Sequence, residues 1–201
     1  MLKLAGELLE GQLADHIARL DAHTRYAYQI FRTGEYMLPS MIGFYSLSQV
    51  TMTANTLYAV PFLAARNMTV DRIAVNIITP DAGKKARMGI YKDGVNLYPG
   101  SLLLDAGEVD VGSGGVKAIT INRSLTRGLY WLAIVSDGTP TVRAATNAST
   151  ILGMNATHAN TQTGWSVAHN YAALPDPFTA GGSLVTDSLK FCIALRLASL
   201  D

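Results

Sequence analysis

Charged residues are scarce in this 201-residue sequence: 15% of the residues are Asp, Glu, Lys or Arg, and the formal net charge is +1. An ordinary soluble domain carries about 25% charged residues. Phosphate binding depends on clustered Lys and Arg, so the nearly neutral balance argues against a nucleic-acid-binding protein. The deficit also indicates that a partner covers part of the surface, or that uncharged polar groups hydrate it.

Cysteine and long apolar runs are lacking as well. Cys192 is the only cysteine, which excludes an intrachain disulfide framework and a cysteine-based zinc site. The longest apolar run is shorter than the about 20 residues that cross a bilayer. Lys3, Gly6 and Glu7 interrupt the N-terminus where a signal peptide would be continuously apolar. We therefore expect one sizeable domain with an appendage, no membrane insertion and no encoded export route.

The appendage is an N-terminal helix. Residues 2–31 contain no proline and are rich in Leu, Ala, Glu, Gln and Arg, which favour helices. Residues recur on one face with spacings of four and three, the pattern of a coiled coil. This seam consists of Leu9, Leu13, His16, Leu20, His23, Ala27 and Ile30. The pattern predicts that residues 1–33 serve oligomerisation and attachment; a helix packed on its own domain is the alternative.

Two histidines lie seven residues apart on this seam, His16 and His23. In a parallel oligomer, stacked imidazoles could bind an anion or a metal ion. Polar residues on a seam more often set the register and the number of helices in the bundle. We therefore assign no metal and no other cofactor to the chain.

From about residue 34 the periodicity changes from helical to two. Gly34 can end the helix, and Pro39 prevents its resumption. Apolar residues then alternate with polar or small residues, as in strands with one buried face. Turn signals rich in Gly, Asp and Pro separate these segments. The alternating segments are residues 70–79, 108–111, 118–121 and 191–198.

The segment 129–135, Leu-Tyr-Trp-Leu-Ala-Ile-Val, is apolar on both faces. Such a run indicates a central strand that is covered on each side. We count roughly eight strands at short spacing with no helical pattern between them. The sequence therefore predicts that residues 34–201 form a mainly β domain, an antiparallel β-sandwich or jelly roll.

Residues 144–188 fit neither period and are predicted to form a long irregular loop. Amides flank its aromatic and imidazole rings, a mixture that sugar-binding surfaces use. The candidate ligand-binding residues are His158, Trp165, His169 and Tyr171. The competing interpretation is that these rings anchor the loop to the domain.

Catalytic motifs are not recognisable. The sequence lacks the Gly-x-Ser-x-Gly elbow of hydrolases, and His158, His169 and Asp176 have no supporting motif that would make them a triad. Most other carboxylates are interpreted as turn residues, namely Asp93, Asp105, Glu108, Asp110 and Asp137. We therefore expect no enzymatic activity; a carbohydrate-active enzyme is the alternative, because the spacing of paired acids is set in three dimensions.

Several segments carry structural motifs, and these cover about residues 34–198. They are Gly34–Pro39 (GEYMLP), Thr53–Phe62 (TANTLYAVPF), Val70–Ile73, Arg87–Tyr91, Pro99–Gly107, Gly128–Ala133 and Leu174–Phe178. In these segments the chain resembles tailed-bacteriophage virion proteins of the fibre, spike and decoration type. The resemblance implies a β-sandwich that is generally trimeric and displayed on a phage head or tail, with no catalytic motif to transfer.

The resemblance, together with the helix seam, implies a homotrimeric virion structural protein, assembled in the host cytoplasm. Its N-terminal helices would bundle and contact other virion proteins, while its β domains project and contact host-surface polysaccharide. A decoration, cement or connector protein without receptor binding is the first alternative. Trimerisation would bury the helix seam and an Ala-rich face carrying Cys192, Ala194 and Ala198, which would account for the low charge.

Overall fold

The computed structural model describes residues 32–42, 46–146, 149–186 and 190–200, and everything below concerns these residues. The chain divides into two units between Arg32 and Thr33, and the second unit is described by itself. The predicted helix seam, from Leu9 to Ile30, lies outside the described residues. Within them, no helix has the length and apolar character needed to cross a membrane.

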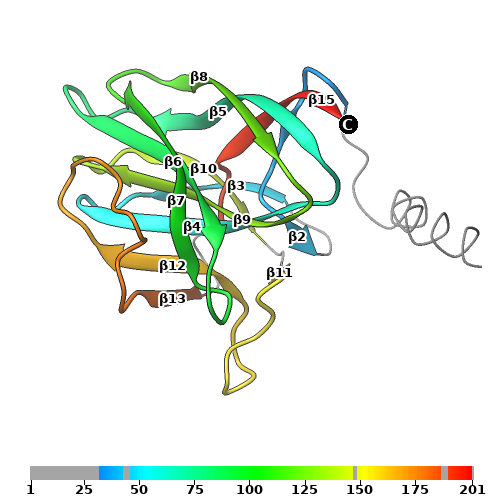
Figure 1. Ribbon diagram of the computed structural model, residues 1–201. Coiled ribbons are helices and arrows are strands. Elements are labelled where there is room, and N and C mark those ends of the chain that lie inside the picture. The colour runs from blue at the N-terminus through cyan, green and yellow to red at the C-terminus, as the bar shows by residue number, and fades with distance from the viewer. Residues whose placement is uncertain (1–31, 43–45, 147–148, 187–189, 201) are drawn as a thin grey trace, which may run out of the picture. The chain divides into compact units, whose positions relative to one another are not determined.

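The described residues are mainly β, as the sequence predicts, and form two large antiparallel sheets and one two-stranded sheet (Figure 1). They contain fifteen strands, more than the roughly eight expected, partly because several strands have only two residues. The strands are β1 (Tyr36–Met37), β2 (Met41–Ile42), β3 (Ser46–Thr51), β4 (Thr56–Ala64), β5 (Met68–Thr79), β6 (Lys85–Asp93), β7 (Pro99–Asp110), β8 (Gly115–Leu125), β9 (Gly128–Ser136), β10 (Thr141–Thr146), β11 (Ser149–Thr150), β12 (Gln162–Ala168), β13 (Ser183–Thr186), β14 (Lys190–Phe191) and β15 (Ala194–Leu200).

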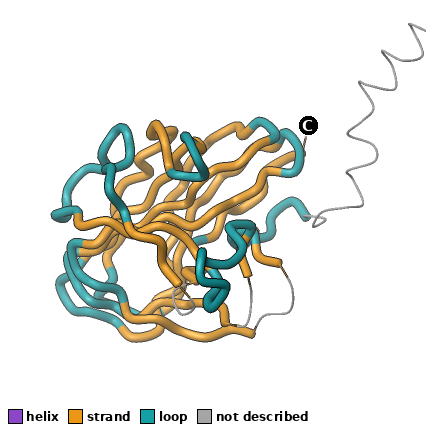
Figure 2. The backbone as a smooth tube through the Cα atoms, turned by 90° about the horizontal axis from the view of Figure 1, so that it is seen from below, coloured by secondary structure: helices purple, strands orange, loops and turns teal. Residues whose placement is uncertain are grey.

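Sheet 1 has the strand order β1-β15-β5-β10-β14, with β8 paired to β5 and β3 paired to β10. Sheet 2 has the order β13-β12-β4-β9-β6-β7, and β2 pairs with β11 separately. Figure 2 shows the strands in an upper and a lower layer. The ring of Tyr58 in sheet 2 lies 4.5 Å from the ring of Phe191 in sheet 1. The two sheets therefore pack against each other, which is consistent with a β-sandwich.

The central strand of sheet 2 is β9, which pairs with β4 on one side and β6 on the other. Residues Tyr130–Ser136 of this strand are buried. Burial on both faces confirms the prediction made from the apolar run at 129–135. In sheet 1, the predicted inward residues Ile73, Val75 and Ile77 of β5 are buried as well.

The prediction of an irregular loop over 144–188 is wrong in part, because β12 and β13 lie within it. In β12, Thr163, Trp165 and Val167 alternate with small residues, so the strand shows little hydrophobic contrast. Gly164 is buried and adjoins the backbone of Ala59, so close that a β-carbon would overlap the Ala59 carbonyl. Because small residues let two strands approach closely here, the segment lacks the hydrophobic periodicity from which a strand is predicted.

The Ala-rich face that was expected to lie at a trimer contact is instead largely buried within the chain. Cys192 and Ala194 are buried within the single chain, and Ala198 is half-buried. Burial raises the pKa of the Cys192 thiol to about 11. Cys192 and Ala194 therefore contribute to the protein's own interior and are not free to explain the low charge through assembly.

Candidate functional site

The candidate site is the face of sheet 2 that points away from sheet 1. Because successive side chains of a strand point to opposite faces, Tyr58 points toward sheet 1 while Leu57 and Ala59 point outward. Across this outer face the register aligns one row of mostly small residues, Ala59, Ala133 and Gly89. Larger residues flank it on both sides: Pro61, Trp131 and Tyr91 on one, Val135 and Arg87 on the other. This row of small residues between larger ones is here called the trough.

The segment 169–182 between β12 and β13, here called the covering loop, packs on this trough (orange in Figure 1). Leu174 and Phe178 of the loop are buried in one cluster with Leu57, Trp131 and Val135 of the sheet. A β-carbon at Gly89 would overlap Cδ1 of Leu174 and would lie 2.5 Å from the Leu104 carbonyl oxygen. Gly89 therefore provides the space in which Leu174 sits.

Aromatic rings fix the far end of the covering loop. Phe178 makes edge contacts with Tyr91, at 5.2 Å between ring centroids, and with Tyr98, at 5.6 Å. Tyr98 in turn lies edge-on to Trp165 at 4.7 Å. The Tyr98 hydroxyl donates to the Thr179 carbonyl oxygen at 2.5 Å. The rings therefore pack in a continuous series from the loop to β12.

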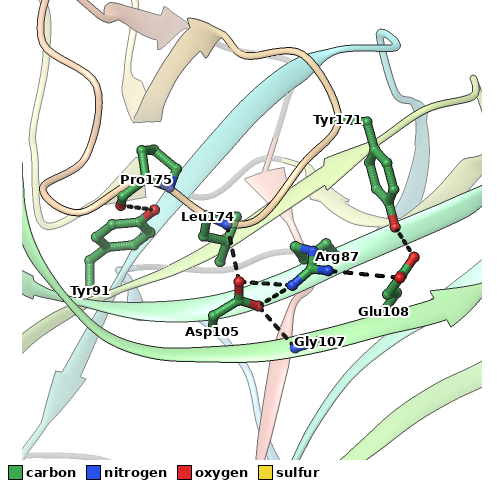
Figure 3. Close-up of polar contacts among 8 residues, drawn as sticks. All are labelled: Arg87, Tyr91, Asp105, Gly107, Glu108, Tyr171, Leu174 and Pro175. Atoms are coloured by element: carbon green, nitrogen blue, oxygen red, sulfur yellow. Dashed lines mark hydrogen bonds and ion pairs between the residues drawn. The ribbon is translucent and has the colours of Figure 1, made fainter.

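An ion pair fixes the middle of the loop (Figure 3). Arg87 Nη1 donates to both carboxylate oxygens of Asp105, at 2.9 and 2.8 Å. Asp105 also accepts hydrogen bonds from the backbone N–H groups of Gly107 and Leu174, each at 3.0 Å. The side chains of Arg87 and Asp105 are only 19% and 21% exposed, respectively. One carboxylate thus binds strand β6, its own strand β7 and the covering loop.

Glu108 forms a second tie three residues further along β7. Its Oε2 accepts the Tyr171 hydroxyl at 2.8 Å, and Lys85 Nζ lies 3.4 Å from the same oxygen. The hydrogen bond from Tyr171, together with Lys85 and Arg87, holds the pKa of Glu108 below its ordinary value. Burial and the bond to Glu108 raise the pKa of the Tyr171 hydroxyl, so the phenol stays protonated and donates.

Further hydrogen bonds to backbone groups attach the start and the middle of the loop. Asn55, which has a positive φ of 56°, accepts the N–H of His169 through its carbonyl oxygen and the N–H of Tyr171 through its side chain, both at 2.9 Å. Tyr91 donates its hydroxyl to the Pro175 carbonyl oxygen at 2.9 Å. Asp176 Oδ1 accepts the N–H of Leu102 at 2.9 Å. The loop is therefore bonded along most of its length.

The four candidate ligand-binding residues do not form one cluster. Trp165, His169 and Tyr171 lie on or beside the covering loop, whereas His158 is exposed in the separate segment 151–161. Trp165 and Tyr171 are half-buried against the apolar cluster. Trp165 Nε1 donates to the Leu97 carbonyl oxygen at 2.7 Å. These two rings thus support the loop, and their contact with a ligand stays a prediction.

The sequence did not identify Arg87, Asp105 and Glu108 as a group. The interpretation of Asp105 and Glu108 as turn residues is wrong, because both lie inside the twelve-residue strand β7. The interpretation fits Asp110, which accepts the N–H of Gly112 at 2.8 Å in the turn that follows. Charged residues within strands β6 and β7 were the available signal for a polar network on this face.

The bond between Tyr171 and Glu108 predicts a change in pH dependence. A carboxyl whose pKa is lower in the folded than in the unfolded chain stabilises the fold above its ordinary pKa, 4.5 for Glu108, and loses this effect as the pH falls through the folded value. In Tyr171→Phe we expect the pKa of Glu108 to rise toward 4.5 and the acid-induced loss of stability to become shallower.

The measurement is an NMR titration of the Glu108 carboxyl carbon, with unfolding curves from neutral to acidic pH. Tyr36→Phe is the control, because Tyr36 is an exposed tyrosine in sheet 1 and Glu108 is bonded by Tyr171 instead. An unchanged Glu108 titration in Tyr171→Phe would contradict the proposed cause.

The described residues contain no group of three His, Cys, Asp or Glu side chains placed to hold a metal ion. The polar groups described above bind one another and the backbone, and in this way they attach the covering loop to sheet 2. Comparison with protein families, curated proteins and solved structures gave no match to the chain.

Proposed function

We propose that this chain is a structural protein of a bacteriophage virion, a homotrimeric fibre or spike of the head or tail. The supporting observation is the way in which the covering loop is held. The single carboxylate of Asp105, which is half-buried, binds Arg87, Gly107 and Leu174. This group therefore restricts the motion of the covering loop. A module displayed on a particle needs a fixed shape, and loops with this many ties have few alternative conformations.

The finer architecture belongs to the same proposal. The β domain is a jelly-roll-like sandwich, and the helix at residues 1–33 forms a short three-stranded coiled coil through its seam. This helix attaches the protein to other virion proteins. Apolar residues at heptad spacing are the physical basis, since they bury one another when helices supercoil.

Adsorption to host-surface glycans is part of the proposal, and the half-buried rings of Trp165 and Tyr171 support it. Aromatic rings offer flat apolar faces to the C–H groups of sugars, and three weak sites on one trimer gain strength through effective concentration. A decoration, cement or connector protein without receptor binding is the alternative. We propose no enzymatic activity and no cofactor.

The test uses phage particles produced from the genome that encodes this chain. We expect antibodies against the purified full chain to label intact virions at one site, the head or the tail, in electron micrographs. Particles labelled no more than an unrelated phage would contradict the virion role. Purified full chain should also slow adsorption of particles to host cells. Labelling without any such competition would favour the decoration or cement protein.

A further inference from the structure

The edge strands of the sheets differ from one another in how well they are protected, and an exposed edge can pair with another chain. Proteins usually guard such edges with charges, proline, bulges or very short strands. Among the described strands of the two large sheets, those with a neighbour on one side only are β1, β3, β8 and β14 in sheet 1 and β7 and β13 in sheet 2.

Five of these six edges carry at least one guard. Strand β7 contains Pro99, Asp105 and Glu108 and has register shifts against β6. Strand β8 contains Lys117 and Arg123 and has a register shift against β5. Strand β13 has four residues and a register shift against β12. Strands β1 and β14 have two residues each. Pairing with another chain is therefore disfavoured at all five.

Strand β3, Ser-Leu-Ser-Gln-Val-Thr over Ser46–Thr51, has none of these guards. It contains no charge and no proline, and its six residues pair with β10 in one continuous register. Ser46 and Thr51, at its two ends, are bonded through their hydroxyls to Thr146 and Thr141 of β10, at 3.0 and 2.9 Å. The strand is therefore tied to β10 at both ends, and the described residues place no other strand on its second backbone edge.

The side chains of β3 add apolar area to this edge. Leu47 is 61% exposed. A strand placed beside β3 would cover it while pairing its backbone groups. The chemistry that fits this edge is thus a neutral extended strand with an apolar residue on the outer face.

We propose that β3 is a pairing edge at which two copies of this chain join, antiparallel across a two-fold axis. A second copy fits because the edge is neutral: an antiparallel two-fold contact sets the strand against its own copy, and β3 brings no charged residue into that contact. The same contact at β7 would bring the acidic residues Asp105 and Glu108 of two copies to one edge. Near the axis, Gln49 of one copy lies opposite or diagonal to Gln49 of the other.

This inference goes beyond the proposed function and uses a different surface. The helical seam sets the smallest species, which would be a trimer. Pairing at β3 is a further, concentration-dependent step that links a chain of one trimer to a chain of another. Because six residues make few hydrogen bonds, we expect this step to be weak for a single pair of edges and stronger when several edges act together.

The experiment is a charge exchange at Gln49 in the full chain. Gln49→Glu and Gln49→Lys each place like charges across the axis, so we expect each variant alone to associate roughly tenfold more weakly than the wild type. An equimolar mixture of the two should recover the association, because opposite charges then face each other. Sedimentation velocity over a range of concentrations measures the step, and hydrogen exchange of the amides of residues 46–51 locates it.

The control pair is Leu47→Lys and Val116→Lys. The two residues are matched in exposure, at 61% and 60%, and both lie on edge strands of sheet 1. We expect Leu47→Lys to weaken the step and Val116→Lys to leave it unchanged, with similar thermal midpoints for both.

Edge pairing at β3 is wrong if amide exchange over residues 46–51 is independent of concentration, if the mixed Gln49 variants associate no better than either alone, or if Val116→Lys has the effect of Leu47→Lys. A smallest species that is not a trimer contradicts the helical bundle of the proposed function instead. The two failures therefore give different results.

Discussion

Gly89→Ala is expected to lower the free energy of unfolding by about 3 kcal/mol or more. The added β-carbon would lie 2.5 Å from the Leu104 carbonyl oxygen and would overlap Cδ1 of Leu174. The Leu104 oxygen belongs to the backbone of the neighbouring strand β7, so it cannot rotate away as a side-chain atom could. Relief requires β6 and β7 to separate, Leu174 to leave the trough, or both.

The measurement is denaturant unfolding followed by tryptophan fluorescence and circular dichroism. Gly114→Ala is the matched control, because a β-carbon there would meet the Ile77 carbonyl oxygen at 3.7 Å, an ordinary contact distance. We expect this control to change the free energy of unfolding by less than about 0.5 kcal/mol. Equal effects at the two glycines would contradict the close approach of Leu174 and of the Leu104 carbonyl oxygen to Gly89.

Asp105→Ala is expected to lower the free energy of unfolding by about 2 kcal/mol. The substitution leaves the guanidinium of Arg87 and the N–H groups of Gly107 and Leu174 without their common acceptor. A fully buried pair would cost more to break, but these side chains are about one-fifth exposed, and water partly replaces the lost partner.

The comparison for this variant is Asp71→Ala, which breaks the ion pair between Asp71 and Arg196 in sheet 1. That pair is more exposed, and the carboxylate of Asp71 binds Arg196 through two hydrogen bonds. We expect a smaller loss of stability from it, and faster amide exchange in residues 169–182 only for Asp105→Ala. A covering loop that exchanges at the wild-type rate in Asp105→Ala would contradict the role given to Asp105.

The sequence predicted the strands that have strong hydrophobic contrast. Residues 129–135 were identified as a central strand because both of their faces are apolar, and β5 was identified from Ile73, Val75 and Ile77. Strand β12 was missed because its partners require small residues: Gly164 must adjoin the Ala59 backbone. A close approach between strands is a property of the packed sheet and leaves little trace in hydrophobic periodicity.

The candidate site was predicted only by its rings. Trp165 and Tyr171 were identified as notable residues of an Asn- and Thr-rich segment, and both pack against the same apolar cluster. Their partners could not be inferred, because Glu108 is 63 residues from Tyr171 and Leu97 is 68 residues from Trp165. Such pairings follow from the strand order of sheet 2, which spacing along the chain does not encode.

The position of the covering loop along the chain has a consequence for synthesis. Residues 169–182 close the outer face of strands that end by residue 136, and β15, at residues 194–200, pairs with β5 in sheet 1. Both layers are therefore completed by segments that leave the ribosome after the strands on which they pack. Until then Leu57, Trp131 and Val135 have no cover on their outer side, and nascent chains with exposed apolar sheets aggregate readily. A chain interrupted before residue 169 would thus be a substrate for chaperones or proteases, whereas a chain that extends through residue 200 can close both layers.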